Sequence, residues 1–438
     1  MIPYFLYVLV LLAYLPGVIA LFVWRKCWHF PILCFAFLGM FFFNAIGSIS
    51  VFSVDKLYLL NFDTADVAVE LTLVLALQVT MFYLVAGTYL ALRPTVKMTP
   101  VADGNDHSLL LIGILIIVLL GTLYYEETGT FLIFKFLDGS MNMENALQFR
   151  EKYLFGLKWW SLYNVGFFFL PLFLSSYALI MFLIDRRQAW FVFMTLVVCL
   201  GSYITLGSKS GVLIFTLTFT ITYLTYSGMT GRDLTEFLRF RKFWFFVGTS
   251  LVLLYTGYDK AMQGDVSPTS FAQQIWYRVF VTYPETLAGA LSYFHDFGGL
   301  GVSVLPTIRG LLPHDQISLS IELHRYIAGA PGGMLVPFVG EVFLIGGWLA
   351  LILLVPVVFA VLIALQEISF LGRSRVAAIA FTASYAFMAL NISLNGMFAS
   401  LFTLVYPTAI FTLLAIHFFL YGVRYGLKIL NKRLASRI

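Results

Sequence analysis

The chain has 438 residues, of which 61% are hydrophobic and only 11% are charged, whereas about a quarter of the residues in a typical soluble domain are charged. These proportions exclude a water-soluble globular protein. The net charge is +5, but the sequence contains no soluble basic domain. Nucleic acid is therefore not an expected partner.

Apolar segments of about twenty residues recur along the chain, the length at which a helix crosses a hydrocarbon core of about 30 Å. We therefore predict an all-α polytopic membrane protein, a single integral membrane domain over 1–438 with about eleven transmembrane helices. In chain order, the predicted spans are 4–24, 30–51, 68–92, 108–124, 161–184, 188–207, 211–229, 243–258, 338–366, 376–393 and 401–422.

Lysine and arginine are distributed unevenly between the two sets of connecting segments. With the N-terminus outside, 17 of the 27 Lys and Arg residues fall on the cytoplasmic side and 10 fall outside. Positive charge favours the cytoplasmic side of a membrane. We therefore predict a multi-pass protein of a bacterial inner (plasma) membrane with a periplasmic N-terminus and a cytoplasmic C-terminus.

Two predicted periplasmic loops, 125–160 and 259–337, are long enough to carry function, because loops of this length are uncommon without a role. In the second loop, Ser267-Pro268 is a typical helix start, and apolar residues follow it at helical spacing. We expect the long loop to carry short helices, one of them amphipathic and lying on the bilayer surface. His295-Asp296, which precedes Gly298-Gly299, is expected in a loop turn.

Basic residues on the predicted periplasmic side run against the usual charge bias. Their side chains either reach the headgroup region, as long cationic side chains often do, or several of them bind an anion such as phosphate, which suits the arginine guanidinium. The candidates for pyrophosphate or substrate binding, with one neighbouring tyrosine, are Arg150, Lys152, Lys209, Arg278, Arg309, Arg325 and Tyr326. Lys209 is expected in a tight Gly-Ser-Lys-Ser-Gly turn over 207–211.

Two side chains are candidates for a catalytic base. His324 offers an imidazole, which titrates near neutral pH. Glu341 stands at the predicted start of a transmembrane helix, where a carboxylate also interacts favourably with the helix dipole, so a structural role stays equally open. Further polar residues that could line the same cavity are Glu70, Gln78, Asn391 and Asn395.

No motif for a bound metal or cofactor is present. The chain has no phosphate-binding loop, dinucleotide glycine motif, zinc-binding helix or serine-hydrolase elbow. The three cysteines have no paired spacing, which argues against a disulfide or a zinc site. We therefore expect no cofactor and no metal.

Three short segments carry a resemblance to a bacterial family: the turn at 207–211, PTIRGLLP at 306–313 and GGMLVPFVGEVFLIGG at 332–347. With its span count and its long late loop, the chain resembles the Wzy-type O-antigen or exopolysaccharide repeat-unit polymerases, which are related to the O-antigen ligases. In the turn, Lys209 replaces the arginine usual in the family, which keeps the charge but not the bidentate fork. Arg325 after His324 departs from the ligase pattern and favours a polymerase.

The resemblance implies a GT-C-like glycosyltransferase that works at the periplasmic face. It would polymerise oligosaccharide repeat units linked to undecaprenyl pyrophosphate into O-antigen or a related surface polysaccharide. Its partners would be these lipid-linked glycans, the lipid bilayer and, as a further candidate, a chain-length regulator. The external cations would stabilise the leaving pyrophosphate. Two alternatives stay open: an O-antigen ligase-like transferase and a non-enzymatic transporter of lipid-linked sugars.

Overall fold

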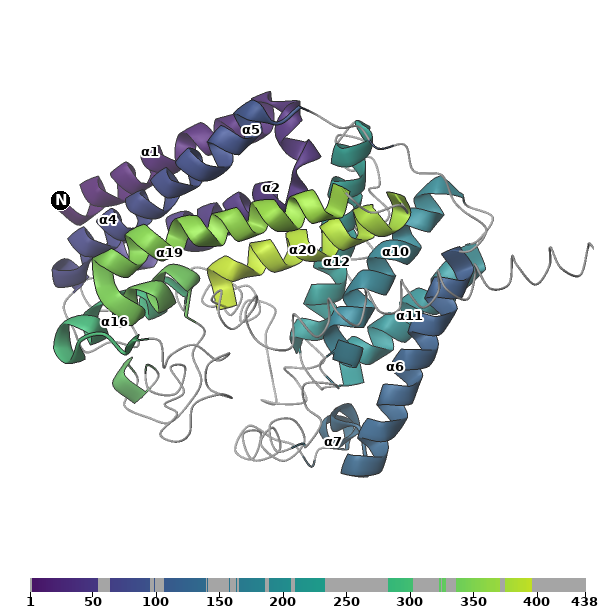
Figure 1. The fold of residues 1–438 in the computed structure, drawn as a ribbon. Helices are drawn as coiled ribbons and strands as arrows, with labels where there is room; N and C mark the ends of the chain where they lie inside the picture. The colour runs from purple at the N-terminus through teal and green to yellow at the C-terminus, as the bar shows by residue number, and fades with distance from the viewer. Residues whose placement is uncertain are drawn as a thin grey trace, which may run out of the picture. The chain divides into compact units, whose positions relative to one another are not determined.

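A computed structural model of the chain describes residues 2–53, 64–94, 98, 106–138, 140, 157, 163, 165–185, 189–205, 209–232, 283–301, 323, 325–327, 336–370 and 375–395. All regular structure in these ranges is helical (Figure 1), as predicted. The predicted spans 243–258 and 401–422 lie outside the described residues, as do the Ser267-Pro268 helix start and most of the loop after Ser140.

The described helices fall into two compact units, with the division inside α12. The first unit comprises α1 (Ile2–Val23), η1 (Arg25–His29), α2 (Pro31–Gly39), η2 (Met40–Ile46), α3 (Ile49–Ser53), α4 (Thr64–Phe82), η3 (Tyr83–Gly87), α5 (Thr88–Leu92), α16 (Tyr283–Phe297), α19 (Phe338–Phe370) and α20 (Arg375–Asn395). The second comprises α6 (Asp106–Thr128), α7 (Leu132–Leu137), η5 (Val165–Phe169), α10 (Leu170–Ile184) and α11 (Ala189–Thr205). Helix α12 (Lys209–Thr230) contributes residues to both.

In the described part of the chain, six helices are long and apolar enough to cross a membrane. They cover Tyr4–Val23, Val67–Leu92, Leu109–Thr128, Gly166–Ile184, Phe338–Phe370 and Arg375–Ile392. Two shorter apolar helices, Pro31–Ile46 and Ala189–Thr205, coincide with predicted spans as well. The chain is therefore a multi-pass membrane protein.

Tyr83 connects the first long helix to the third predicted span. Pro16 lies inside α1, where its ring removes one backbone donor from the helix. The Tyr83 hydroxyl accepts a hydrogen bond from the backbone N–H of Gly17 (3.0 Å) and donates one to the carbonyl of Ala13 (3.0 Å). It therefore bridges backbone groups on both sides of the proline and holds α1 against η3.

Helix α2 packs directly on α20. A Cβ atom added at Gly39 would lie 2.5 Å from the backbone oxygen of Leu390, so the two backbones are in contact. Small residues permit such close approach between helices in membranes. The contact places α2 in the interior of the first unit, and most of its side chains are buried.

A buried polar network joins α1, η2 and α4. The Tyr14 hydroxyl and the Asn44 amide both donate to Oε1 of Gln78, at 3.2 and 3.1 Å. Such bonds between helices satisfy polar groups for which the lipid chains offer no hydrogen-bond partner. Gln78 was predicted to line a cavity together with Glu70, and this network gives it a role in helix packing.

Helix α19 is a hairpin of two helices and not the single straight span predicted over 338–366. Its backbone leaves helical geometry at Gly346 and Gly347, and the ring of Phe338 lies 6.1 Å from that of Phe359. In a straight helix these two residues would be about 31 Å apart. The first part, 338–345, thus folds back along the second, as Figure 1 shows. The second part is about 35 Å long, which is enough to cross a bilayer by itself.

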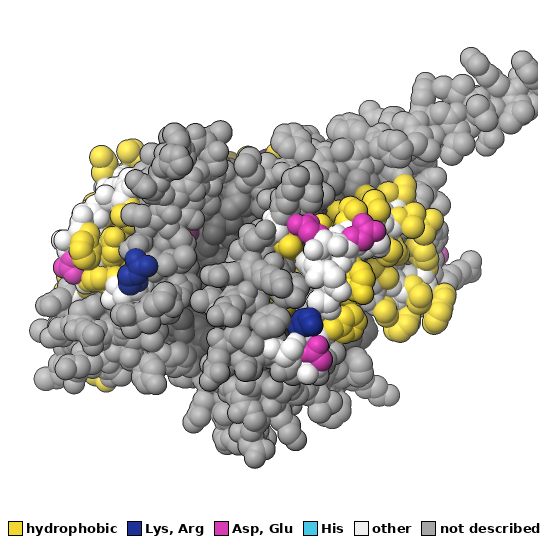
Figure 2. Space-filling model, turned by 90° about the horizontal axis from the view of Figure 1, so that it is seen from below, with side chains coloured by type: hydrophobic (Ala, Val, Ile, Leu, Met, Phe, Trp, Pro, Cys, Tyr) yellow, Lys and Arg dark blue, Asp and Glu magenta, His cyan; other side chains and the backbone are white. Residues whose placement is uncertain are grey.

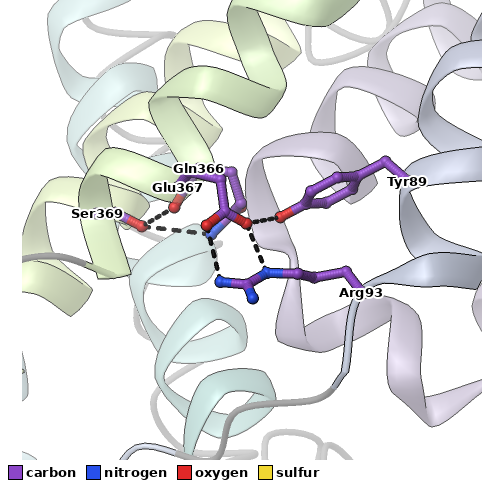
Figure 3. A network of polar contacts seen from close by, with 5 residues as sticks. All are labelled: Tyr89, Arg93, Gln366, Glu367 and Ser369. Atoms are coloured by element: carbon purple, nitrogen blue, oxygen red, sulfur yellow. Dashed lines mark hydrogen bonds and ion pairs between the residues drawn. The ribbon is translucent and has the colours of Figure 1, made fainter.

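A second polar network lies where α5 and α19 end (Figure 3). The Arg93 guanidinium donates two hydrogen bonds of 2.8 Å to the carboxylate of Glu367, which also accepts one from Tyr89. The adjacent Gln366 Oε1 accepts a hydrogen bond from the backbone N–H of Ile32 (3.1 Å). These bonds connect α5, α19 and the start of α2.

The second unit packs α10 against α11 and α6. Where α6 ends, Tyr124, Tyr163 and Phe167 form a buried aromatic cluster. The Tyr163 hydroxyl donates a 2.6 Å hydrogen bond to Glu127. This contact fixes the end of α6 relative to η5.

Candidate functional site

Helix α16 carries the candidate site and lies within the predicted long loop 259–337. It begins with Tyr283-Pro284, and proline is well placed in a first helical turn because its missing N–H has no partner there. It ends before Gly298, which adopts φ +79° and donates its N–H to the carbonyl of Phe294, a common glycine termination. A short helix in this loop was predicted, although at a different position.

The two halves of α16 differ in environment. Its first half is buried, with Glu285 and Leu287 almost inaccessible, whereas Phe297 at its end is 65% exposed. A Cβ atom added at Gly340 would lie 3.1 Å from the Leu287 side chain, so the first half packs on the short helix 338–345. Only the last turn of α16 is therefore available to a ligand.

His295 and Asp296 lie in that last turn, and the prediction of a loop turn for them was wrong. The helix continues to Phe297 because the glycines that end it come only afterwards. As helical neighbours, the two side chains point in directions about 100° apart. They therefore contact different partners.

His295 pairs with Glu70 of α4. The imidazole Nε2 lies 2.6 Å from Oε2 of the carboxylate, and the His295 side chain is 60% exposed while that of Glu70 is only 13% exposed. Glu70 is three residues inside the candidate span Val67–Leu92. The pair thus holds an accessible imidazole near the end of this candidate span, with a protected carboxylate behind it.

Asp296 pairs with Tyr326. The Tyr326 hydroxyl donates a 2.6 Å hydrogen bond to Oδ2 of Asp296 and shares a 2.8 Å hydrogen bond with Ser292. The phenol ring meets Tyr293 and Phe297 edge-on. Burial and the bond to Asp296 raise the pKa of Tyr326 above its ordinary value, so this phenol stays protonated and keeps donating to Asp296.

The His295–Glu70 pair has the chemistry of a general base. A carboxylate that accepts from one imidazole nitrogen orients the ring and stabilises the imidazolium form. The other nitrogen, Nδ1, is then free to take a proton from a substrate hydroxyl. Neither residue was among the predicted bases. The two positions are 225 residues apart, and no local sequence pattern relates them.

Among the predicted site residues, the structure brings Tyr326 to this last turn of α16. Arg325 is exposed. Glu341 is buried in the first turn of α19. A carboxylate in this position also interacts favourably with the helix dipole.

Lys209 is the first residue of α12, so the prediction of a turn was wrong for 209–211, which are helical. Residues 206–208 lie outside the described residues. The remaining predicted site residues, His324, Arg150, Lys152, Arg278 and Arg309, lie outside the described residues.

No group of three His, Cys, Asp or Glu side chains that could hold a metal ion occurs among the residues that the structure describes. Asn391 of α20 donates to the carbonyl of Phe387 in its own helix (3.0 Å), a local bond that does not depend on a cavity.

Comparisons with known proteins add no identification. The chain matches no protein-family model, and comparisons with curated proteins and with solved structures find no match.

Proposed function

We propose that the protein is a membrane-embedded glycosyltransferase that polymerises undecaprenyl-pyrophosphate-linked repeat units, with His295 as its base. The observation that carries the proposal is the accessible imidazole bonded to the protected Glu70 carboxylate at the end of a candidate span. A lipid-linked sugar begins at the headgroup level, so a base that acts on it has to stand at that boundary. The resemblance of the sequence to repeat-unit polymerases supplies the substrate class.

The proposed reaction transfers a glycan between two lipid carriers. His295 takes the proton of an acceptor sugar hydroxyl, and the oxygen forms a bond to the anomeric carbon of the donor glycan. The bond from that carbon to the pyrophosphate breaks, and undecaprenyl pyrophosphate leaves with the electron pair. Glu70 stabilises the imidazolium, which is charged only after the proton transfer.

The leaving pyrophosphate needs positive charge, which the proposal assigns to Lys209, Arg278 and Arg309. We further propose about eleven spans and a periplasmic N-terminus, following the charge bias, so that the last turn of α16 faces the periplasm. Alanine at each of the three cations should leave the protein in the membrane and remove long polymer. Lys209→Arg should retain activity, whereas Arg309→Lys should lose much of it if its contact is bidentate.

The direct test uses purified protein in lipid with lipid-linked repeat units. The wild type should give a ladder of polymer lengths, and His295→Asn should reduce the rate by about 10²–10⁴-fold, the usual contribution of general-base catalysis. His107→Asn, in the first turn of α6, is the matched control and should polymerise normally. If His324→Asn abolishes polymerisation while His295→Asn does not, His324, the base predicted from the sequence, acts in place of His295. Wild-type rates for His295→Asn would overturn the assignment.

A deletion strain separates the polymerase from the alternatives. Mass analysis of its lipid-linked glycans should show single repeat units. Long polymer that is not attached to its final acceptor would indicate a ligase, and accumulation on the cytoplasmic face would indicate a transporter.

A further inference from the structure

Asp296 is an exposed carboxylate that the proposed chemistry does not use. Exposed charge is scarce in this protein: only 11% of its residues are charged, and on the face that Figure 2 shows, the described charged side chains stand in small groups beside hydrophobic surface. Asp296 lies in the same helical turn as His295, and both side chains are exposed. A carboxylate in this position is a candidate for binding the substrate on which the imidazole acts.

One oxygen of Asp296 is fixed by Tyr326. Oδ2 accepts the hydrogen bond of the Tyr326 hydroxyl at 2.6 Å, a length typical of a hydroxyl bonded to an ionised carboxylate. The phenol gives its single proton to Asp296, so Ser292 donates to the phenol oxygen, at 2.8 Å. Ser292 and Asp296 are four residues apart and therefore share one face of α16. The carboxylate is thus held in one orientation.

The other oxygen of Asp296, Oδ1, is open to a ligand. No residue in the described part of the chain donates a hydrogen bond to it. An ionised carboxylate only accepts hydrogen bonds, so a ligand at Oδ1 has to supply O–H or N–H groups. Because the bond to Tyr326 already restrains the side chain, little of its rotational freedom remains to be lost when such a ligand binds.

Charge determines which part of a substrate fits at Asp296. His295 has two carboxylates beside it: Glu70, whose Oε2 lies 2.6 Å from Nε2, and Asp296, the next residue in the chain. Both repel the negatively charged pyrophosphate of a lipid-linked donor. The acceptor, in contrast, reacts through an uncharged sugar hydroxyl, and sugar hydroxyls are the O–H donors that Oδ1 requires. This side of His295 therefore suits the acceptor.

We propose that Asp296 binds the acceptor sugar, with Oδ1 accepting a hydrogen bond from a hydroxyl next to the one that His295 deprotonates. The Cα atoms of neighbouring residues are about 3.8 Å apart, so one sugar ring can meet both side chains. Tyr326 and Ser292 are positioning residues that hold the carboxylate. This assignment rests on the proposed glycan transfer and adds to it the group that selects and orients the acceptor.

The experiment uses the full-length protein in nanodiscs, with the lipid-linked repeat unit as donor. The acceptor is the same oligosaccharide released from its lipid and labelled at the released end, so it has no pyrophosphate and cannot act as a donor. Elongation of the label gives the acceptor KM and kcat, and saturation-transfer NMR without donor gives its Kd.

Asp296→Asn keeps an oxygen for the Tyr326 hydroxyl but removes the charge. It should raise the acceptor KM and Kd about ten- to hundredfold, the usual contribution of hydrogen bonds to a charged group, and change kcat less. Tyr326→Phe leaves the carboxylate in place and should raise KM by a smaller factor. Asp138→Asn, at another exposed carboxylate, is the matched control and should behave like the wild type.

Acceptor analogues that each lack one hydroxyl of the terminal sugar separate a binding role of Asp296 from a structural one. With the wild type, one of these analogues should lose kcat/KM by the same factor, because its partner on the protein is left unpaired. With Asp296→Asn the same analogue should lose no further activity, since the interaction is already absent.

Asp296 does not bind the acceptor if Asp296→Asn leaves the acceptor KM and Kd unchanged, or if every analogue loses the same factor with the wild type and the variant. Normal elongation by the wild type would then still support the proposed transfer. Conversely, oligosaccharide binding that depends on Asp296, without any elongation, would confirm the sugar site and overturn the transfer.

Discussion

Arg93 and Glu367, 274 positions apart in the chain, form a bidentate ion pair where α5 and α19 end. The hydrogen bonds and the charge of Glu367 raise the pKa of Arg93 above its ordinary value. The ion pair joins the end of the run of α4, η3 and α5 to the end of α19. Glu70 lies at the opposite end of the same run of α4, η3 and α5, about 34 Å away along the helix axis.

Thiol accessibility should reveal which end of these helices faces the periplasm. In a variant without the native cysteines, which are buried, a membrane-impermeant thiol reagent should label His295→Cys in spheroplasts. It should label Arg93→Cys and Glu367→Cys only after the membrane is opened. Labelling of the Arg93 and Glu367 positions in closed spheroplasts would reverse the orientation and remove the proposed site from the periplasm.

The His295–Glu70 pair should act as a unit. Glu70→Gln should lower kcat with little change in KM, because the carboxylate stabilises a charge that develops only during the reaction. Adding Glu70→Gln to His295→Asn should then cost much less than Glu70→Gln alone, because residues of one catalytic unit are not additive. Rates of polymer formation for the two single variants and the double variant test this, and full additivity would contradict it.

The stabilisation that Tyr326 provides should not change in mildly alkaline solution. Its raised pKa means that the neutral phenol, which donates to Asp296, is favoured in the folded protein. The stabilisation is fully present below the ordinary tyrosine pKa of about 10 and is lost only as the pH rises through the higher folded value. Melting temperatures of wild type and Tyr326→Phe should therefore keep a constant difference up to about pH 10. A difference that already shrinks near pH 8 would contradict the assignment.

The break in α19 should depend on glycine at one position. Gly347 has φ +61°, and an added Cβ would lie 2.8 Å from the Phe294 ring. Gly347→Ala should cost about 1–3 kcal/mol in strain, read as a lower melting temperature in detergent. At Gly346 an added Cβ would meet Ala350 at an ordinary 3.4 Å, so Gly346→Ala should cost less. Equal effects would mean that backbone strain is not the cause.

Removing the Tyr83 hydroxyl should weaken α1. Tyr83→Phe leaves the backbone N–H of Gly17 and the carbonyl of Ala13 without this bridge, at a cost of about 1–3 kcal/mol for buried polar groups. Tyr4→Phe is the control, since Tyr4 is exposed. Thermal unfolding in the same detergent compares the two, and a shift as small as that of the control would show that α1 does not need the bridge.

The helical architecture was accessible from the sequence because apolar length is a strong signal in membranes. Each span of the described part coincides with a predicted one. The break at Gly346–Gly347 was not found, since an apolar run continues through it and hydropathy does not register a change of direction. The packing of Phe338 on Phe359 is a tertiary contact, which the periodicity of the sequence does not predict.

The candidate site was accessible only in part. Tyr326 was named for its neighbours in the sequence, and the structure adds its partner Asp296. His295 was read as part of a turn because glycines follow it closely, yet the helix ends only after Phe297. Its partner Glu70 lies in another predicted span, and no local pattern relates two positions so far apart.

The hairpin in α19 resolves a mismatch of length. As one straight helix, its 33 residues would extend about 50 Å, far beyond a hydrocarbon layer of about 30 Å. Helices with such an excess usually tilt, or thicken the bilayer around them. Here the excess is folded back against the protein, so the remaining helix can stand near the membrane normal and the surrounding lipid keeps its relaxed thickness.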